Sequence, residues 1–95
     1  MNKKSTIVIP ADPSDEEDFS LSDVAVERAL MGRRIRQIRK SLGLTQEQFA
    51  NRYRIPLGNI RQYEIGRTLP PPAVRAYLTV IEAEPVITAK ALSAA

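Results

Sequence analysis

The chain contains neither cysteine nor histidine. Without cysteine there are no disulfide bonds, no thiolate nucleophiles and no zinc sites of the cysteine type. Without histidine the commonest metal ligand and the usual general base near neutral pH are both missing. These two absences disfavour most classes of enzyme, and the sequence predicts no catalytic residue, no metal site and no cofactor.

Long hydrophobic runs are also absent. The apolar run Ile7–Ile9 is followed at once by Pro10, so it is too short for a secretory signal or a membrane span. A composition of 43% hydrophobic and 26% charged residues over 95 residues is typical of one small globular domain. We therefore expect a cytoplasmic protein with no membrane partner.

Charge is divided unevenly along the chain. Residues 1–29 carry three basic and seven acidic residues, whereas residues 30–95 carry eleven basic and four acidic ones. Most of the eleven are arginine, which favours forked contacts with phosphate and with base edges. The division predicts a basic body that meets a polyanion, although surface charge also serves solubility.

Residues 1–20 show no helical periodicity. A short strand-like run, Ser5 to Ile9, precedes two prolines and the acidic cluster Asp15–Asp18, a pattern typical of a linker. We expect a flexible acidic N-terminal arm over residues 1–20 and a domain over residues 21–95. The arm either adds a strand to the sheet of a partner or is a plain tail.

The domain is predicted to be all-α, with four to five short helices. The first helix begins near Ser20 or Ser22, is interrupted at Gly32 and stops at Gly43. Its apolar stripe follows helical spacing. The stripe consists of Val24, Met31, Ile35, Ile38 and Leu42.

Two short helices follow within the next 24 residues. Thr45 and Gln48 form a capping box that starts the second helix, and Pro56 suits the first turn of the third, which Gly66 closes. The buried side of these two helices is predicted to comprise Phe49, Ala50, Tyr53, Ile60 and Tyr63, with Leu57 at its edge.

The C-terminal part is predicted to form a fourth helix and a short final one. Three consecutive prolines keep residues 67–72 extended until Pro72 takes the first helical position. The fourth helix directs Val74, Tyr77, Leu78 and Ile81 inward and ends at Pro85, and a weak helix follows over residues 86–95. A dimer face is expected at Leu78, Ile81, Val86 and Ile87.

The second and third helices are separated by a short turn, which is helix-turn-helix geometry. The third helix exposes Gly58, Asn59, Arg61 and Gln62. Asn and Gln side chains can pair with adenine, and Arg with guanine, in the major groove of double-stranded DNA. Since Gly58 has no side chain, the backbone there can approach a base or sugar closely.

The chain resembles the Cro/CI repressor-type (XRE) helix-turn-helix domains over about residues 33–82. The resemblance is carried by Arg39, the run 43–50, Ile60, Tyr63-Glu64, Gly66 and Pro70. It implies a lambda-repressor-like bundle that binds operator DNA as a homodimer. Residues 55–64, 67–72 and 80–85 look more narrowly like HigA-type antitoxins, which neutralise a ribonuclease toxin of the RelE/HigB kind.

The resemblance also implies roles for single residues. Base reading falls to Leu57, Gly58, Asn59, Arg61 and Gln62, although Leu57 and Gly58 stand where phage repressors have polar residues. Gln46 is expected from the resemblance to hold a phosphate. From the residues themselves we expect further phosphate contacts at Thr45, which lies at the helix N-terminus, and at Arg36 and Arg67. Arg61 serves equally well as a phosphate contact. Arg39 is expected to pair with Glu64 and fix the third helix against the first.

There are two alternative functions. The sequence barely distinguishes a repressor without a toxin partner from an antitoxin. A metal-dependent enzyme would use Asp15, Glu16 and Asp18 to hold Mg²⁺, yet these carboxylates lie in a proline-flanked stretch without a rigid scaffold.

Overall fold

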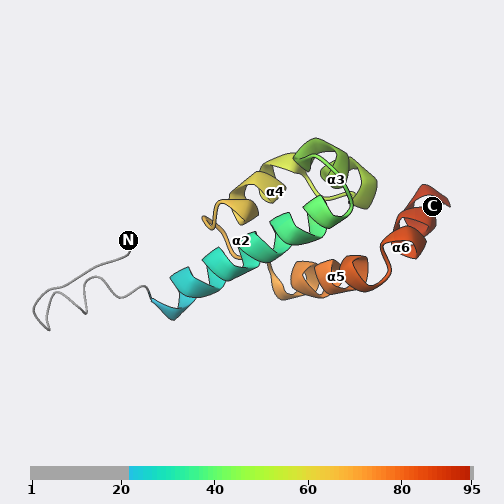
Figure 1. Ribbon diagram of the computed structural model, residues 1–95. Helices are drawn as coiled ribbons and strands as arrows, with labels where there is room; N and C mark the ends of the chain where they lie inside the picture. The colour runs from blue at the N-terminus through green and yellow to red at the C-terminus, as the bar shows by residue number, and fades with distance from the viewer. Residues whose placement is uncertain (1–21, 95) are drawn as a thin grey trace, which may run out of the picture.

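The computed structural model describes residues 22–94, which form helices and no strand (Figure 1). The helices are α2 (Asp23–Ser41), α3 (Gln46–Tyr53), α4 (Leu57–Glu64), α5 (Pro72–Ala83) and α6 (Pro85–Ala94). The predicted all-α class is therefore confirmed. The predicted arm over residues 1–20, with its strand-like run, lies outside the described residues.

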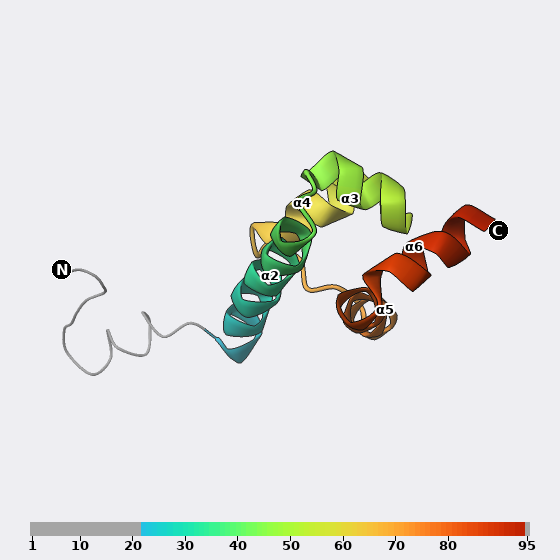
Figure 2. The ribbon, with the colours of Figure 1, turned by 45° about the vertical axis from the view of Figure 1, so that its right-hand side comes forward.

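The long helix α2 packs against α4, and α3 packs against both α4 and α6 (Figure 1). Helix α5 runs along the side of α2 opposite to α4, and α6 continues from α5 beyond the C-terminal end of α2 (Figures 1 and 2). The pair α3–α4 thus forms one outer edge of the bundle formed by residues 22–94.

Helix α2 begins because the hydroxyl of Ser22 accepts a hydrogen bond from the backbone N–H of Ala25 at 3.0 Å. It ends before Gly43, whose φ of 71° is a conformation that glycine adopts at little cost. The predicted interruption at Gly32 was wrong, since α2 continues through this residue and buries it. Val24, expected in the apolar stripe, is 50% exposed because the first turn of α2 extends past the bundle.

The capping box of α3 is present as predicted. The backbone N–H of Gln48 donates to the Thr45 hydroxyl at 3.1 Å, and the Thr45 N–H donates to Gln48 Oε1 at 2.9 Å. Arg54 ends the helix in the left-handed conformation, with φ of 61°, and Ile55 turns the chain into α4. These two ends define a helix, a tight turn and a second helix.

Proline sets the ends of the last two helices. Pro72 is the first residue of α5, as predicted, because its missing N–H is not needed there. Helix α5 ends at Ala83, and Pro85 opens α6, so Pro85 both prevents continuation and starts the next helix. The weak final helix that the sequence indicated is therefore present.

The core lies where α2, α3, α4 and α5 meet. Its buried apolar residues are Ile35, Ile38, Phe49, Ala50, Tyr53, Ile55, Ile60, Tyr63, Leu78 and Ile81. Leu78 and Ile81 have no exposed surface, so their predicted place in a dimer face was wrong. Helical spacing cannot distinguish a core face from an interface, because both are apolar. Val86 and Ile87, by contrast, are 74% and 63% exposed.

Two tyrosine hydroxyls tie the C-terminal helices to α3. The Tyr53 hydroxyl donates to the Pro85 carbonyl at 2.9 Å, and the Tyr77 hydroxyl donates to the Tyr53 carbonyl at 2.7 Å. Burial raises the pKa of Tyr77 above its ordinary value.

Among residues 22–94, no helix has the length and apolar character needed to cross a membrane.

Candidate nucleic-acid interface

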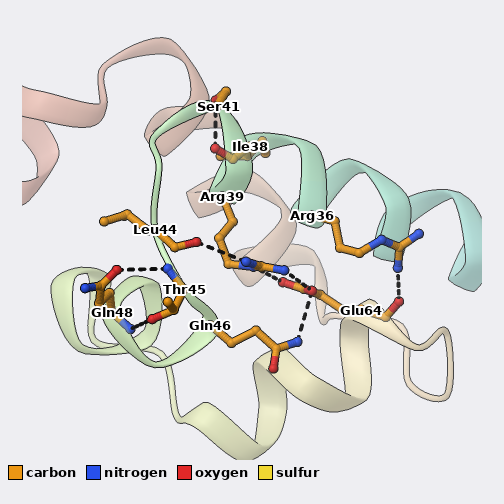
Figure 3. A network of polar contacts seen from close by, with 9 residues as sticks. All are labelled: Arg36, Ile38, Arg39, Ser41, Leu44, Thr45, Gln46, Gln48 and Glu64. Atoms are coloured by element: carbon orange, nitrogen blue, oxygen red, sulfur yellow. Dashed lines mark hydrogen bonds and ion pairs between the residues drawn. The ribbon is translucent and has the colours of Figure 1, made fainter.

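An ion pair between Arg39 on α2 and Glu64 at the end of α4 lies behind the α3–α4 edge (Figure 3). Arg39 Nε is 2.8 Å from Glu64 Oε2, and Arg39 Nη2 is 2.9 Å from Glu64 Oε1. The two side chains are only 11% and 3% exposed. This is the pairing that the resemblance implies, in the forked geometry that gives arginine its strongest carboxylate contacts.

The charge of Arg39 is secured by this contact. The hydrogen bond to Glu64 raises the pKa of Arg39, burial lowers it, and the attraction of the carboxylate raises it again. The net direction is upward from a value already far above neutral pH. Arg39 therefore stays protonated at neutral pH, and the stabilisation linked to its raised pKa is lost only as the pH rises through that pKa.

Glu64 also binds Gln46 from α3. Gln46 Nε2 donates to Glu64 Oε1 at 3.0 Å, while Arg39 Nη1 donates to the Leu44 carbonyl at 3.0 Å just before α3 (Figure 3). One carboxylate and one guanidinium thus connect α2, α3 and α4. The sequence did not reveal the Gln46–Glu64 contact, because the two residues are 18 positions apart and come together only when α3 and α4 pack.

The residues at the start of α3 that are predicted to contact phosphate, Thr45 and Gln46, do not use all of their hydrogen-bond donors within the protein. The bond to Glu64 uses one of the two amide N–H groups of Gln46. The hydroxyl and N–H of Thr45 are engaged in the capping box. The backbone N–H groups of Gln46 and Glu47 precede the first intrahelical hydrogen bonds, so this helix end is suited to an anion.

The outer face of α4 contains the residues predicted to read bases. Gly58, Asn59 and Arg61 are exposed, and Leu57 and Gln62 are half-buried. The opposite face carries Ile60, Tyr63 and Glu64, all buried. The 3.6-residue period therefore places the polar side chains together on the solvent side of a helix whose other side is anchored.

The structure separates the two arginines predicted to contact phosphate. Arg67 is exposed just after α4, next to Gly66. Arg36 is half-buried on α2, and its Nη1 donates to the Glu64 carbonyl at the C-terminal end of α4. Arg28 Nε likewise donates to the Gly66 carbonyl at 3.1 Å. The last carbonyl groups of a helix lack intrahelical partners, and this general rule was the only available signal for the contact of Arg36 with Glu64. Gly66 lies past the end of α4, and no sequence signal indicated its contact with Arg28.

The remaining arginines in the middle of α2 differ in their surroundings. Arg33 is exposed. Arg34 instead reaches across to α5, where its Nη2 lies 2.8 Å from Glu82 Oε1 in a partly exposed ion pair. This pair joins α2 to α5 on the side of α2 away from α4.

Gly32 lies where the backbones of α2 and α4 come close together. A Cβ atom built on Gly32 would lie 2.5 Å from the Tyr63 carbonyl oxygen and 2.8 Å from that of Glu64. Only glycine permits this approach. The sequence had predicted that Gly32 interrupts the helix, whereas its role in the structure is to let α2 and α4 pack closely. The short distance between the helices brings Arg36 and Arg39 within reach of Glu64.

Within residues 22–94, no three acidic side chains lie close enough together to hold a metal ion. The carboxylates that an enzyme would use, Asp15, Glu16 and Asp18, lie outside the described residues.

Comparison with known protein families matches residues 30–90 to the helix-turn-helix domain. Neither a curated protein nor a solved structure shows significant similarity to the chain. The match spans more than half of the 95 residues and includes the whole of α3 and α4. The chain therefore belongs to the helix-turn-helix domain family, whose members are DNA-binding modules.

Proposed function

We propose that this protein is a sequence-specific regulator of transcription of the Cro/CI (XRE) type, which binds operator DNA as a homodimer. In this proposal α4 enters the major groove of double-stranded DNA. The N-terminal end of α3 contacts phosphate on the strand beside the groove. Paired subunits give a small module enough specificity, since they contact two half-sites about one helical turn apart.

The observation that carries the proposal is the exposed polar face of α4 on a rigidly held helix. Asn59 and Arg61 are exposed, while the end of the same helix is fixed to α2 and α3 through the buried Glu64. Base reading requires side chains held in a defined orientation, and such anchoring removes part of the entropic cost of binding.

Selection from a pool of random duplexes tests this function directly. We expect the purified protein to enrich a sequence with related half-sites, and its affinity to fall steeply as salt rises, because phosphate contacts release counterions. Failure to enrich any sequence at modest ionic strength would overturn the proposal.

Substitutions on α4 and α3 are expected to affect binding differently. Asn59→Ala and Gln62→Ala should each cost about 1–3 kcal/mol of preference for the selected sequence, because they remove contacts to base edges. Gln46→Ala should weaken selected and random duplexes alike, because a phosphate contact carries no sequence information. Fluorescence anisotropy on both duplexes measures the two effects. An equal loss on random DNA for Gln62→Ala would remove Gln62 from the base-reading set.

Gly58→Ala separates stability from binding. A Cβ at Gly58 meets nothing within 4 Å, so we expect the free protein to gain about 0.5–1 kcal/mol from the better helix propensity of alanine. The same methyl group should hinder close approach of the α4 backbone to DNA and lower affinity. Thermal denaturation followed by circular dichroism, together with anisotropy on the selected duplex, checks both. A variant that binds with unchanged affinity would show that DNA does not approach this backbone.

The finer proposal is that the regulator acts as a HigA-like antitoxin. Its support is the resemblance of residues 55–64, 67–72 and 80–85 to such antitoxins. Co-expression with a small basic ribonuclease encoded next to it, with growth as readout, tests neutralisation. Deleting residues 1–20 then shows whether the acidic arm is needed for neutralisation, for DNA binding or for neither. A neighbourhood without such a ribonuclease favours a stand-alone repressor.

A further inference from the structure

An open groove of about 700 Å³ lies between α3 and α6, away from the exposed face of α4. Within the described chain, no residue of α4 lines it and none of its lining residues is acidic. The groove is lined by three cationic side chains and several apolar ones. The cationic residues are Arg52, Arg54 and Lys90, and the apolar residues include Leu44, Val86 and Leu92.

The two walls of the groove are held in place by Arg54. Its Nη2 donates to the Leu92 carbonyl at 2.8 Å, which joins the end of α3 to α6. Arg52 and Lys90 are exposed, and Val86 is 74% exposed. No ion pair joins Arg52 or Lys90 to another residue among residues 22–94. The groove therefore offers two positive charges beside an apolar wall, a surface suited to an acidic segment that also carries a large apolar side chain.

Residues 15–19 of this chain have that chemistry. They read Asp-Glu-Glu-Asp-Phe, with four carboxylates followed directly by one phenyl ring. We infer that the groove between α3 and α6 binds the segment Asp15–Phe19 of a second copy of this chain. The carboxylates pair with Arg52 and Lys90, and Phe19 packs on the apolar wall.

Chain length places this contact between copies rather than within one. An extended chain spans at most about 3.6 Å per residue, so Asp18 lies within about 14 Å of Ser22 and Asp15 within about 25 Å. Helix α2 has 19 residues and is about 28 Å long. Helix α6, which forms one side of the groove, lies beyond the C-terminal end of α2 (Figures 1 and 2). The acidic segment of the same copy is therefore too short to reach it.

The inference deepens the proposed homodimer and accounts for the uneven division of charge along the chain. Exchange of two arms would bury two acidic segments in two basic grooves and leave α4 of each copy free. Each exposed ion pair contributes modestly, and we expect a two- to fivefold change in the self-association constant for each pair that is lost. Self-association should also weaken at high salt.

A charge-swap experiment on the full chain, without DNA, tests the contact. The groove variant carries Arg52→Glu and Lys90→Glu, and the arm variant carries Asp15→Lys, Glu16→Lys, Glu17→Lys and Asp18→Lys. Analytical ultracentrifugation should show that each variant alone associates more weakly than the wild type. An equimolar mixture should recover association, because both grooves then face arms of opposite charge. Arg54 is left unchanged because it supports the groove itself.

The matched control carries Arg33→Glu and Lys40→Glu, the same charge change at exposed positions of α2 outside the groove. Circular dichroism shows which variants remain folded, and Phe19→Ala, which changes no charge, should weaken association by itself. Weaker association of the groove variant, with an α2 control that associates like the wild type, supports the contact. Equal weakening of the groove variant and the α2 control, or an arm variant that associates like the wild type, overturns it. A dimer that survives both reversals leaves the proposed homodimer standing and overturns only the arm exchange.

Discussion

Replacing Glu64 by glutamine is expected to lower the free energy of unfolding by about 3–5 kcal/mol, because it leaves a buried arginine without its counter-charge. Glu64 is 4% exposed and accepts hydrogen bonds from Arg39 and Gln46 at 2.8 to 3.0 Å. Glutamine keeps the shape of the side chain but turns one acceptor into a donor that faces donors. A small domain has only about 5–15 kcal/mol in total, so the expected loss is a large share of its stability.

Urea denaturation followed by circular dichroism measures this loss, since the chain has no tryptophan for fluorescence. The matched control is Glu82→Gln, which breaks the ion pair with Arg34, where the side chains are 39% and 51% exposed. Solvent screens that pair, so its loss should cost at most about 1 kcal/mol. Equal losses for the two variants would contradict the role given to burial.

Replacing both partners distinguishes an unpaired charge from a lost contact. The double variant Arg39→Met with Glu64→Leu removes both charges and fills the space with apolar atoms. We expect it to be more stable than Glu64→Gln, since no buried charge is left without a partner. The double variant could instead be less stable than Arg39→Met alone and Glu64→Leu alone. That result would show that the hydrogen bonds themselves, including those to Leu44 and Gln46, contribute more to stability than the charge pairing does.

The second large effect is expected for Gly32→Ala, which should destabilise the protein by about 1–3 kcal/mol although alanine is the better helix former. The added Cβ would approach the Tyr63 and Glu64 carbonyl oxygens to 2.5 and 2.8 Å. Both are backbone atoms, which move only when the end of α4 moves. Separation of α2 from α4 would also loosen the contacts of Arg36 and Arg39 with Glu64.

Gly58→Ala is the matched control, because a Cβ at that helical position meets nothing within 4 Å. This substitution is expected to raise the free energy of unfolding, whereas Gly32→Ala is expected to lower it. Both stabilities are read from the same denaturation experiment. If Gly32→Ala is as stable as the wild type, the two helices are not held as close together as the structure shows. DNA affinity should fall for Gly32→Ala as well, since the displaced helix is the one that meets bases.

Helix ends and the buried side of most helices could be predicted from the sequence, because these depend on neighbours in the chain. Ser22, the capping box at Thr45 and Gln48, and Pro72 each act through residues within four positions. The apolar spacing around Ile35 and Ile60 likewise follows from the helical period alone. The candidate base-reading face of α4 was predicted on the same basis, as the side opposite to its apolar residues.

Contacts between helices were decided only by the tertiary structure. The role of Gly32, the bond from Gln46 to Glu64 and the engagement of Arg36 with α4 each join residues far apart in sequence. What covers Leu78 and Ile81 belongs with them, since helical spacing predicted that both residues point inward but not that helices of the same chain bury them completely. Local chemistry thus determined where each helix begins, ends and turns its apolar side. Packing determined which polar groups meet, because that depends on the distances and angles at which whole helices approach one another.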